Sequence, residues 1–490
     1  MNTKQLRQKI LNLAIRGKLV PQDPNDEPAS VLLERVCYEK ERLIKAGKIK
    51  RDKGNYGIDK THYEQLPDGW AWTTLGAYLD VRDGTHDTPK YVENGVPLIT
   101  SKNLCNGMID FDNVKLISID DHKIISLRSQ VDDEDILFAM IGSIGNPVLV
   151  RKMSDFSIKN VALFKKILES INMSYVRYYL EYVQDKMKIT AKGGLQPFVP
   201  LNMLRTYQIC IPPLAEQRRI VAAIESAFSV IDEIERNKTD LQAAVAAAKS
   251  KILDLAIRGK LVPQDPDDES AGVLLERIQE KKERLEKEGA IKRTKSLSPI
   301  LDDELPFHIP ERWKWSRLGN IAFYKKGPFG SSITKSMFVP DSETVIKVYE
   351  QKNAIGKDHT LGTYYINSEK FNELQGFEVF PNDIIVSCAG TIGEAYVMPV
   401  SMRKGIINQA LMRVMLYEIG MTDFYLLYFD FMLKNTAQDD SKGTAMKNIP
   451  PFDILKQYLI PIPPLAEQQR IVSAIEAAFK QLDRIAGILI

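Results

Sequence analysis

The feature that most constrains this fold is an internal repeat that is split across the two ends of the chain. The segment Ile-Pro-Pro-Leu-Ala-Glu-Gln occurs at Ile211–Gln217 and again at Ile462–Gln468, at an offset of 251 residues. A second match joins Ile10–Arg51 to Ile252–Arg293, where 31 of 42 positions are identical at an offset of 242. This period is far beyond the roughly 20–50 residues of solenoid repeats, so the pattern predicts a twofold object rather than an array.

The head and the tail of the chain together make up one further copy of the central repeat. At the first offset Ile490 corresponds to Thr239, and at the second offset Met1 corresponds to Ala243. The tail therefore stops almost where the head resumes. We expect a circular pseudo-twofold arrangement in which the two chain ends are neighbours.

The central copy of the repeat predicts one long helix. No Gly or Pro occurs between Leu214 and Arg258, and Pro213 and Gly259 are suited to its first turn and to its end. If the segment is unbroken, it spans roughly 67 Å at about 1.5 Å per residue. Apolar residues recur every three or four positions, at Ile220, Ile224, Phe228, Ile231 and Ile234. Such a stripe needs a partner helix, so we expect two long antiparallel helices that pack as a coiled coil, the second supplied by the head and the tail.

Composition excludes several classes of protein. The formal net charge is +2, so a nucleic-acid-binding surface has to come from local segregation of charge. The four cysteines (Cys37, Cys105, Cys210 and Cys388) lie far apart, which argues against a disulfide framework and against a zinc site. There is no signal peptide and no apolar run near the roughly 18 residues of a membrane span, so we expect a cytoplasmic protein without membrane contact.

Two variable domains alternate with the repeat. The predicted division is an N-terminal repeat segment with a linker (1–65), a first variable domain (66–210), a central repeat region with a linker (211–304), a second variable domain (305–461) and a C-terminal repeat helix (462–490). In the first variable domain, β-branched runs predict strands and one stretch predicts a helix, at 96–100, 114–119, 135–141 and 147–150 for the strands and 175–189 for the helix. The mixture predicts an α/β class, of mixed α+β type.

The motifs of this chain resemble those of the specificity subunit of type I restriction-modification systems. The segment Pro-Pro-Leu-Ala-Glu-Gln closes a divergent domain and opens a long helix twice in the chain, and Asp83–Pro89 (Asp-Gly-Thr-His-Asp-Thr-Pro) is similar to a phrase common in the target-recognition domains of that family. The second domain lacks the Asp-Gly-Thr-His phrase and has Lys325–Ser332 (Lys-Lys-Gly-Pro-Phe-Gly-Ser-Ser) nearby, so individual contacts do not transfer from the first domain to the second. The resemblance covers essentially the full length of the chain.

The resemblance implies a non-catalytic subunit for defence against foreign DNA. Each variable domain would read one half of a bipartite, asymmetric site in double-stranded DNA, and the helical struts would set the spacer between the half-sites. Two modification (methyltransferase) subunits would dock on the struts, with restriction subunits added for cleavage. No cofactor is expected in this chain, whereas the partner subunits are expected to use S-adenosylmethionine, ATP and Mg²⁺.

Polar side chains in predicted loops beside Gly or Pro are the candidates for DNA contacts. Asn and Gln can pair with adenine, and Lys with guanine or phosphate, although many loop residues are simply solvated. The candidates in the first domain are Thr85, His86, Lys90, Lys102, Asn103, Ser143, Lys192 and Gln196. The candidates in the second domain are Lys325, Lys326, Ser331, Ser332, Lys335, Lys352, Thr444 and Lys447. By contrast, we expect Trp70, Trp72, Trp313 and Trp315, which open the two domains, to be core anchors rather than stacking platforms.

Two other functions stay open. Asp341, Glu350 and Lys352 fit a loose pattern of a metal-dependent nuclease, with two acids and a lysine around a metal ion, but the first domain has no counterpart. A protein–protein scaffold whose variable domains bind peptides is the other possibility. The sequence contains no Gly-x-x-x-x-Gly-Lys-Ser/Thr phosphate loop, so ATP hydrolysis by this chain is not expected.

Overall fold

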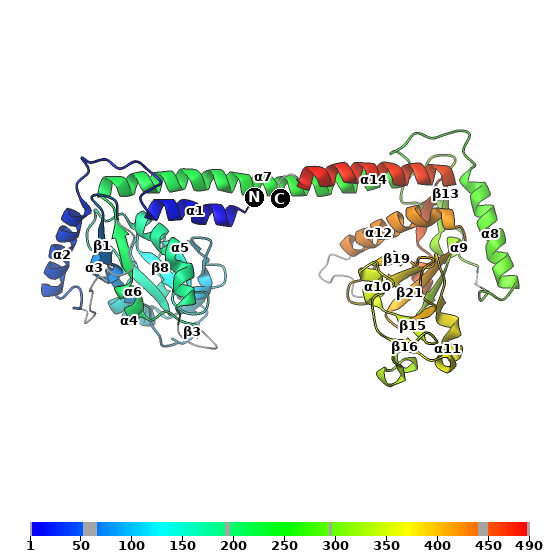
Figure 1. Cartoon of the computed structure of the whole chain (residues 1–490), viewed down its shortest axis with the longest axis horizontal. Helices are drawn as coiled ribbons and strands as arrows, with labels where there is room; N and C mark the ends of the chain where they lie inside the picture. Colours follow the sequence, from blue (N-terminus) through cyan, green and yellow to red (C-terminus); the bar gives the residue numbers. More distant parts are fainter. Residues whose placement is uncertain (1, 52–65, 192–196, 294–295, 440–448, 488–490) are drawn as a thin grey trace. The chain divides into compact units, whose positions relative to one another are not determined.

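The computed structural model describes residues 2–51, 66–191, 197–293, 296–439 and 449–487. Its contacts divide the chain into two compact units, Met1–Thr239 and Asp240–Ile490. Helix α7 (Leu214–Ile257) contributes residues to both units (Figure 1). Among the described residues, no helix is long and apolar enough to cross a membrane.

In the first unit, helix α1 (Thr3–Ile15) packs along the N-terminal part of α7 (Figure 1). Leu11 and Ala14 are fully buried in the same core as the stripe residue Ile220. The guanidinium of Arg7 lies over the ring of Phe228, 4.7 Å from its centroid, and forms an ion pair with Asp232. Ile15, at the other end of α1, contacts Cys210 just before α7 begins, so the two helices run antiparallel.

In the second unit, helix α14 (Leu465–Gly487) packs in the same way along the C-terminal part of α7 (Figure 1). Ala256 of α7 is buried with Ile471 and Ile475 of α14. Lys249 corresponds to Arg7 in the repeat; it forms an ion pair of 2.6 Å with Asp483 and lies 5.1 Å from the ring centroid of Phe479. The predicted pairing of the long helix with the head and with the tail is therefore confirmed within each unit.

The motif Pro-Pro-Leu-Ala-Glu-Gln forms a buried clamp at the start of α7. The carboxylate of Glu216 accepts a 2.9 Å hydrogen bond from the indole N–H of Trp70, and burial raises the pKa of this carboxyl group. The side chain of Gln217 donates to the carbonyl of Pro212, at 2.9 Å. Gly17 closes α1 at a φ of +64°, and a Cβ there would collide with the prolyl ring of Pro67.

The same clamp recurs at the start of α14. Glu467 accepts a 2.9 Å hydrogen bond from the indole of Trp313, and burial again raises the pKa of the acid. Gln468 donates to the carbonyl of Pro463, at 3.0 Å. Trp70 is 8% exposed and Trp313 is 2% exposed, whereas Trp72 and Trp315 are half-buried. The clamps explain why the motif must contain both an acid and an amide at these two positions.

The variable part of the first unit contains two four-stranded sheets, in the orders β2-β11-β8-β9 and β10-β4-β7-β3. Two further strand pairs are β1-β12, which joins the entry of the domain to its exit, and β5-β6. The strands are β1 (Ala71–Thr74), β2 (Asp80–Asp83), β3 (Tyr91–Val92), β4 (Val96–Ile99), β5 (Leu104–Cys105), β6 (Met108–Ile109), β7 (Lys115–Ile117), β8 (Ile136–Ala139), β9 (Gly145–Leu149), β10 (Ser157–Ile158), β11 (Val161–Lys165) and β12 (Gln208–Ile211).

The second unit repeats this topology with two changes, one of which is that the described residues contain no counterpart of the β5-β6 pair. Its sheets have the orders β14-β21-β18-β19 and β16-β15-β20-β17, and β13 pairs with β22. In both units one strand of the second sheet, β4 or β15, has one parallel and one antiparallel neighbour. The outer strand differs: β3 lies beside the antiparallel neighbour β7 in the first unit, whereas β17 lies beside the parallel neighbour β20 in the second. The strands are β13 (Lys314–Arg317), β14 (Ala322–Lys326), β15 (Ile346–Tyr349), β16 (Tyr365–Ile366), β17 (Glu378–Val379), β18 (Ile384–Ser387), β19 (Ala395–Val397), β20 (Gly405–Ile407), β21 (Leu411–Leu416) and β22 (Leu459–Ile462).

Side-chain alternation along β8 shows how the first sheet is buried on both faces. Ile136 and Phe138 belong to the core that continues into α5, whereas Leu137 and Ala139 face the core that also contains Ile99 of the second sheet. The remaining helices are α2 (Ala29–Lys45), α3 (Leu75–Tyr78), α4 (Ile119–Ser129), α5 (Met173–Ile189), α6 (Leu201–Thr206), α8 (Ala271–Lys287), α9 (Leu318–Ile321), α10 (Gln351–Ile355), α11 (Ser368–Leu374), α12 (Thr422–Asp439) and α13 (Phe452–Leu455). The predicted mixed α/β class is confirmed.

Candidate functional site

Loops that follow or precede several strands meet at one end of the strands of the first sheet, in the first unit. Strands β2 and β8 are both antiparallel to β11, so the ends of β2 and β8 lie at the same edge as the start of β11. Four segments gather there: 84–88, 101–103, 142–145 and 159–160. We call these segments the open edge. It unites Thr85, His86, Lys102, Asn103 and Ser143, which the sequence placed in three separate predicted loops.

His86 is braced on both sides by its neighbours at the open edge. Its Nε2 lies 2.9 Å from the carboxylate of Asp83, and its Nδ1 lies 3.0 Å from the side-chain amide of Asn160. Asp83 is buried and also pairs with Arg128. The His86 side chain is nevertheless 58% exposed, so it is held in place while its ring still faces solvent. Gly84 is required before this turn, because a Cβ there would collide with the carbonyl of Ile158.

The turn after β4 is fixed by Asn103 and presents Lys102. The Oδ1 of Asn103 accepts from the backbone N–H of Thr100 at 3.0 Å, and its Nδ2 donates to the carbonyl of Asp110 at 3.2 Å. Asn103 is buried, whereas Lys102 is exposed and has no polar partner among the described residues. The amide of Asn103 is thus occupied by the backbone, and its effect is to position Lys102.

Hydrogen bonds join the segments of the open edge to one another. The hydroxyl of Ser101 donates to the carbonyl of Asn160 at 3.3 Å, and the hydroxyl of Ser143 donates to the carbonyl of Ser101 at 3.2 Å. Gly142, beside Ser143, has a φ of +74° and open space where a Cβ would lie. A ligand can approach the backbone closely at this glycine.

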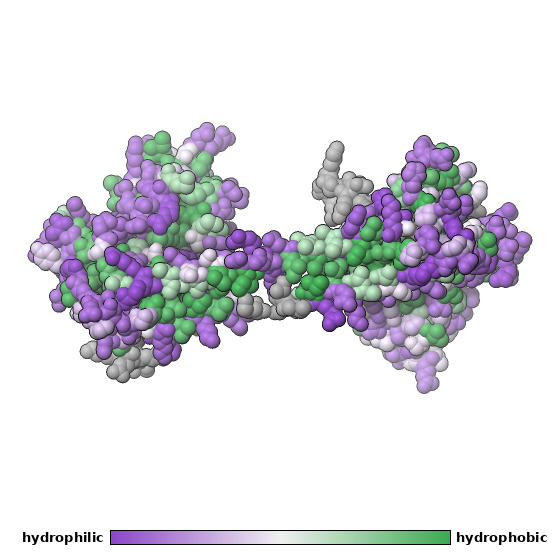
Figure 2. Space-filling model, turned by 90° about the horizontal axis from the view of Figure 1, so that it is seen from above, coloured by the Kyte–Doolittle hydropathy of each residue, from purple (hydrophilic) through white to green (hydrophobic). Residues whose placement is uncertain are grey.

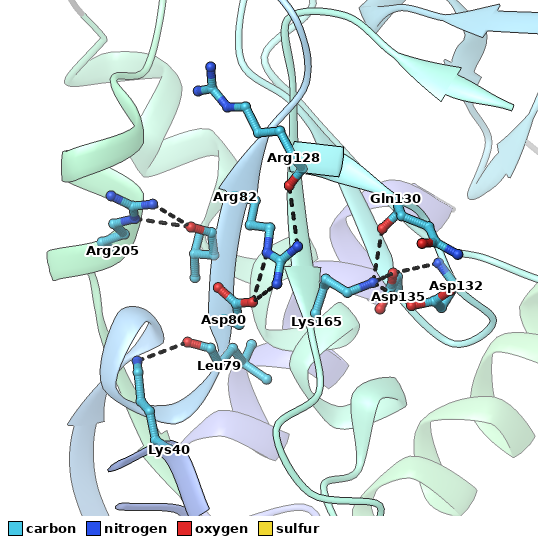
Figure 3. Close-up of polar contacts among 11 residues, drawn as sticks. Lys40, Leu79, Asp80, Arg82, Arg128, Gln130, Asp132, Asp135, Lys165 and Arg205 are labelled. Carbon is cyan, nitrogen blue, oxygen red and sulfur yellow. Dashed lines mark hydrogen bonds and ion pairs between the residues drawn. The ribbon is translucent and has the colours of Figure 1, made fainter. Parts of the chain in front are cut away.

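The opposite edge of the same sheet, formed by the starts of β2 and β8 and the end of β11, uses its cations internally (Figure 3). We call it the closed edge. Arg82 forms an ion pair with Asp80 at 2.6 Å, and Lys165 contacts Asp132 at 2.8 Å and Asp135 at 2.6 Å (Figure 3). Cations paired in this way are neutralised within the protein, so this edge has less to offer an anionic ligand.

The open edge has a counterpart in the second unit. Gly327 corresponds to Gly84, and a Cβ there would collide with the carbonyl of Asn408. Asn353 corresponds to Asn103: its Oδ1 accepts from the backbone N–H of Glu350 at 2.8 Å, and its Nδ2 donates to the carbonyl of Leu361 at 2.7 Å. Gln351 donates to the carbonyl of Ala389, which links the turn after β15 to the Gly-Thr-Ile-Gly loop. Gly390 in that loop has a φ of +68° and is as open as Gly142.

The other candidates from the sequence differ in their exposure and in their contacts. Lys90, Lys326, Ser331 and Lys335 are exposed, and Thr85 and Ser332 are partly exposed. Lys325 is half-buried with its Nζ 4.7 Å from the ring centroid of Phe377, and burial lowers its pKa. Lys352 is exposed and forms an ion pair with Glu350. Lys192, Gln196, Thr444 and Lys447 lie outside the described residues.

The sequence candidates missed three groups that the structure brings to these edges. Asn160 braces His86 from a left-handed turn with a φ of +55°, and an Asn before a predicted strand was its only local signal. Phe329 occupies the place of His86 in the second unit and is 86% exposed. Thr100 and Glu350 precede Lys102 and Lys352 by two residues, and the sequence singled out Glu350 only as an acid of the nuclease pattern.

The acids of the nuclease pattern are engaged by cations of the protein. Asp341 forms a 2.7 Å ion pair with Arg403, and Glu350 forms a 2.9 Å ion pair with Lys352. Within the described ranges, no group of three His, Cys, Asp or Glu residues could hold a metal ion. The geometry therefore gives no support to the nuclease alternative.

Comparisons with known proteins bear on the same two regions. A family model, the type I restriction modification DNA specificity domain, matches residues 83–242 and 310–489. The EcoAI specificity subunit of a type I restriction enzyme from Escherichia coli is 29% identical, over 99% of this chain and 90% of its own length. The EcoEI specificity subunit, from the same organism, is 29% identical over 98% of this chain and 90% of its own length.

A solved structure shares the fold. It comes from work on complex assembly and conformational transition of the type I restriction-modification system, and it covers 87% of this chain and 94% of its own, with a TM-score of 0.60 and 18% identity. The family model alone accounts for more than half of the sequence, in one stretch from each unit. The chain therefore belongs to the type I restriction-modification DNA specificity family, as a specificity subunit.

Proposed function

We propose that the two variable domains, 66–210 and 305–461, each read one half of a bipartite site in double-stranded DNA, through the open edge of the first domain and its counterpart in the second. The observation that carries this assignment is the contrast between the two edges of the first sheet. Lys102 at the open edge has no polar partner among the described residues, whereas Lys165 at the closed edge is neutralised by two acids. Phosphate binding requires cations of the first kind.

The open edge offers several kinds of DNA contact. Lys102 would neutralise a phosphate, as would Lys90 from the segment just before β3, and the backbone at Gly142 would allow a strand to approach closely. His86 and Ser143 would face base edges, His86 because its ring is held in one orientation by Asp83 and by Asn160. Preorganised donors and acceptors of this kind lose little conformational entropy on binding.

The second domain would use different groups at the same place. Lys326 and Lys335 would contact phosphate, with Ser331 and Ser332 between them. Phe329 offers an apolar contact of the kind made with the methyl group of thymine. Two domains with the same frame and different contact groups fit the reading of two different half-sites.

The helix pairs would dock two modification subunits and set the spacer between the half-sites, with restriction subunits added for cleavage. Apolar surface along each helix pair supports a docking role (Figure 2). Val230 on α7 is 55% exposed, and Ile485 on α14 is 46% exposed. S-adenosylmethionine, ATP and Mg²⁺ would be used by the partner subunits, not by this chain.

A pair of lysine substitutions tests the edge assignment. In the full chain co-expressed with its modification subunit, Lys90→Gln with Lys102→Gln should weaken duplex binding and flatten the salt dependence. A slope of about 0.9 per phosphate contact predicts a change of about two. Lys123→Gln is the matched control, because Lys123 lies on α4 and is paired with Asp120. An equal effect of the control and the double variant would show that the edge assignment is wrong.

A further inference from the structure

The two units carry the same lysine turn after the central strand of the second sheet, but its first residue differs. In both turns an Asn binds the backbone N–H three residues before it, which aligns Lys102 with Lys352 and Thr100 with Glu350. The hydroxyl of Thr100 donates to the same Asn103 Oδ1, at 2.9 Å. The hydroxyl of Thr100 is therefore used inside the turn, and Lys102 has no polar partner among the described residues. Glu350, in contrast, places a carboxylate beside the ammonium group of Lys352.

Lys352 lies in a niche that holds its ammonium group in place. Its Nζ is 2.9 Å from Glu350 Oε2 and 5.6 Å from the ring centroid of Tyr364. The ring of Tyr364 is itself stacked on Phe338, with centroids 4.2 Å apart. Gly362, at a φ of +95°, closes the niche from the backbone side, since a Cβ there would lie 2.9 Å from Glu350 Oε2 and 3.0 Å from Lys352 Cε.

The exposure of the two groups shows how this pair meets solvent. The side chain of Glu350 is 16% exposed and that of Lys352 is 49% exposed, so the acid lies beneath and the ammonium group faces outward. An ammonium group paired with a carboxylate has little net charge to attract phosphate, but the carboxylate and the aromatic ring restrict where the ammonium group can lie. A lysine without a polar partner among the described residues, such as Lys102, keeps its full charge for phosphate, and no neighbouring group restricts its position.

We propose that the two equivalent lysines have different roles in DNA binding. This inference rests on the proposed function, in which both edges bind DNA. Lys102 is a phosphate anchor and contributes affinity without regard to sequence. Lys352, held by Glu350, is a specificity-determining donor that reads an acceptor on a base edge in the major groove, with guanine O6 and N7 as the expected partners. The residue two positions before the lysine decides between the two roles.

The test compares salt dependence with base specificity in the full chain and its modification subunit. Lys102→Gln should reduce the slope of log affinity against log salt by about one and weaken all duplexes alike. Lys352→Gln should leave that slope unchanged and relax the preference at one base pair of one half-site, by roughly tenfold to hundredfold. A slope change by Lys352→Gln equal to that of Lys102→Gln would overturn the proposal.

Exchanging the deciding residues supplies matched reciprocal variants. Glu350→Thr should free Lys352, steepen the slope by about one and strengthen binding to unrelated duplexes, and Glu350→Gln should do the same without changing the shape of the side chain. Thr100→Glu should flatten the slope by about one. Unchanged slopes in all three variants would contradict the proposal. If the parent complex bound duplexes without any salt dependence, the proposed function itself would fail, which is a separate outcome.

Discussion

The two units are alike in the clamps that join the variable domain to the helix. They differ in which cation neutralises a buried acid inside the domain. Asp135 at the start of β8 and Asp383 at the start of β18 occupy the same position, with side chains that are each 3% exposed. Asp135 pairs with Lys165, at the end of its strand. Asp383 pairs with Arg413, in the middle of a strand, where the first unit has the buried Leu163.

The same sheet topology therefore allows the buried acid to pair with a cation from either of two positions, the end of the neighbouring strand or its middle. Lys165 lies at the closed edge, where a second acid, Asp132, shares it, and its side chain is 14% exposed. Arg413 is only 10% exposed and lies between the sheets, with a 2.6 Å hydrogen bond to the carbonyl of Glu378. The second unit should therefore depend on its ion pair much more than the first unit does.

The largest expected effect separates the two ion pairs. Arg413→Met should destabilise the second unit by about 3–5 kcal/mol, because it leaves the carboxylate of Asp383 buried without its cation. Lys165→Met should cost the first unit less, because Lys165 lies at the end of its strand and Arg413 lies between the sheets. The backbone hydrogen bonds do not separate the two acids, since Asp135 accepts from the N–H of Asp132 at 2.7 Å and Asp383 accepts from the N–H of Phe380 at 2.8 Å. Native-state hydrogen exchange, read separately for each unit, measures both changes. Equal losses would show that the position of the cation does not matter.

A smaller effect concerns pH. Burial, partly opposed by Arg413, raises the pKa of Asp383 from an ordinary value of 3.8 to about 6. Between these values the folded protein holds a proton that the unfolded chain has released, so this group's contribution to stability is complete below about pH 3.8 and is lost as the pH rises through about 6. The loss should be about 2–3 kcal/mol, at about 1.4 kcal/mol per pKa unit.

The control for this pH effect is Asp383→Asn. This variant should lose the dependence of second-unit stability on pH in that window, although it will be less stable overall because Arg413 then lacks its partner. A titration of the carboxyl carbon by NMR gives the pKa directly. A value near 3.8 in the folded protein would contradict this prediction, because it would mean that the ion pair and the hydrogen bonds of the acid offset its burial completely.

The clamps should show the smallest difference between the units. Trp70→Phe and Trp313→Phe each remove the indole donor to a buried carboxylate, Glu216 or Glu467, and each should cost about 1–3 kcal/mol. The two hydrogen bonds have the same length, so the two losses should be similar. Trp313→Phe should cost slightly less, because Glu467 also accepts a 2.6 Å hydrogen bond from Gln264, whereas Oε1 of Glu216 has no hydrogen-bond partner among the described residues. Thermal unfolding of the two variants makes the comparison, and a large difference would show that the clamps are equivalent in shape but not in energy.

The features that could be predicted from the sequence are those written into local spacing or into the repeat. The stripe Ile220–Ile234 predicted a paired helix because helix periodicity is local, and the shared place of Trp70 and Trp313 predicted a core role for both. The convergence of Ser101, Ser143 and Asn160 could not be predicted, because it depends on the register between strands far apart in the chain. Asn103 shows a second limit: the residue type indicated a hydrogen-bonding amide, but only the fold shows that the backbone occupies it.

The central claim, that each variable domain reads its own half-site, is tested most directly by domain exchange. Residues 66–210 would be replaced by the corresponding domain of a relative with a different target, and methylated sites would be sequenced in cells that carry the chimaera and its modification subunit. We expect one half of the methylated sequence to change, while the other half and the spacer between them stay the same. A change in both halves would contradict the account.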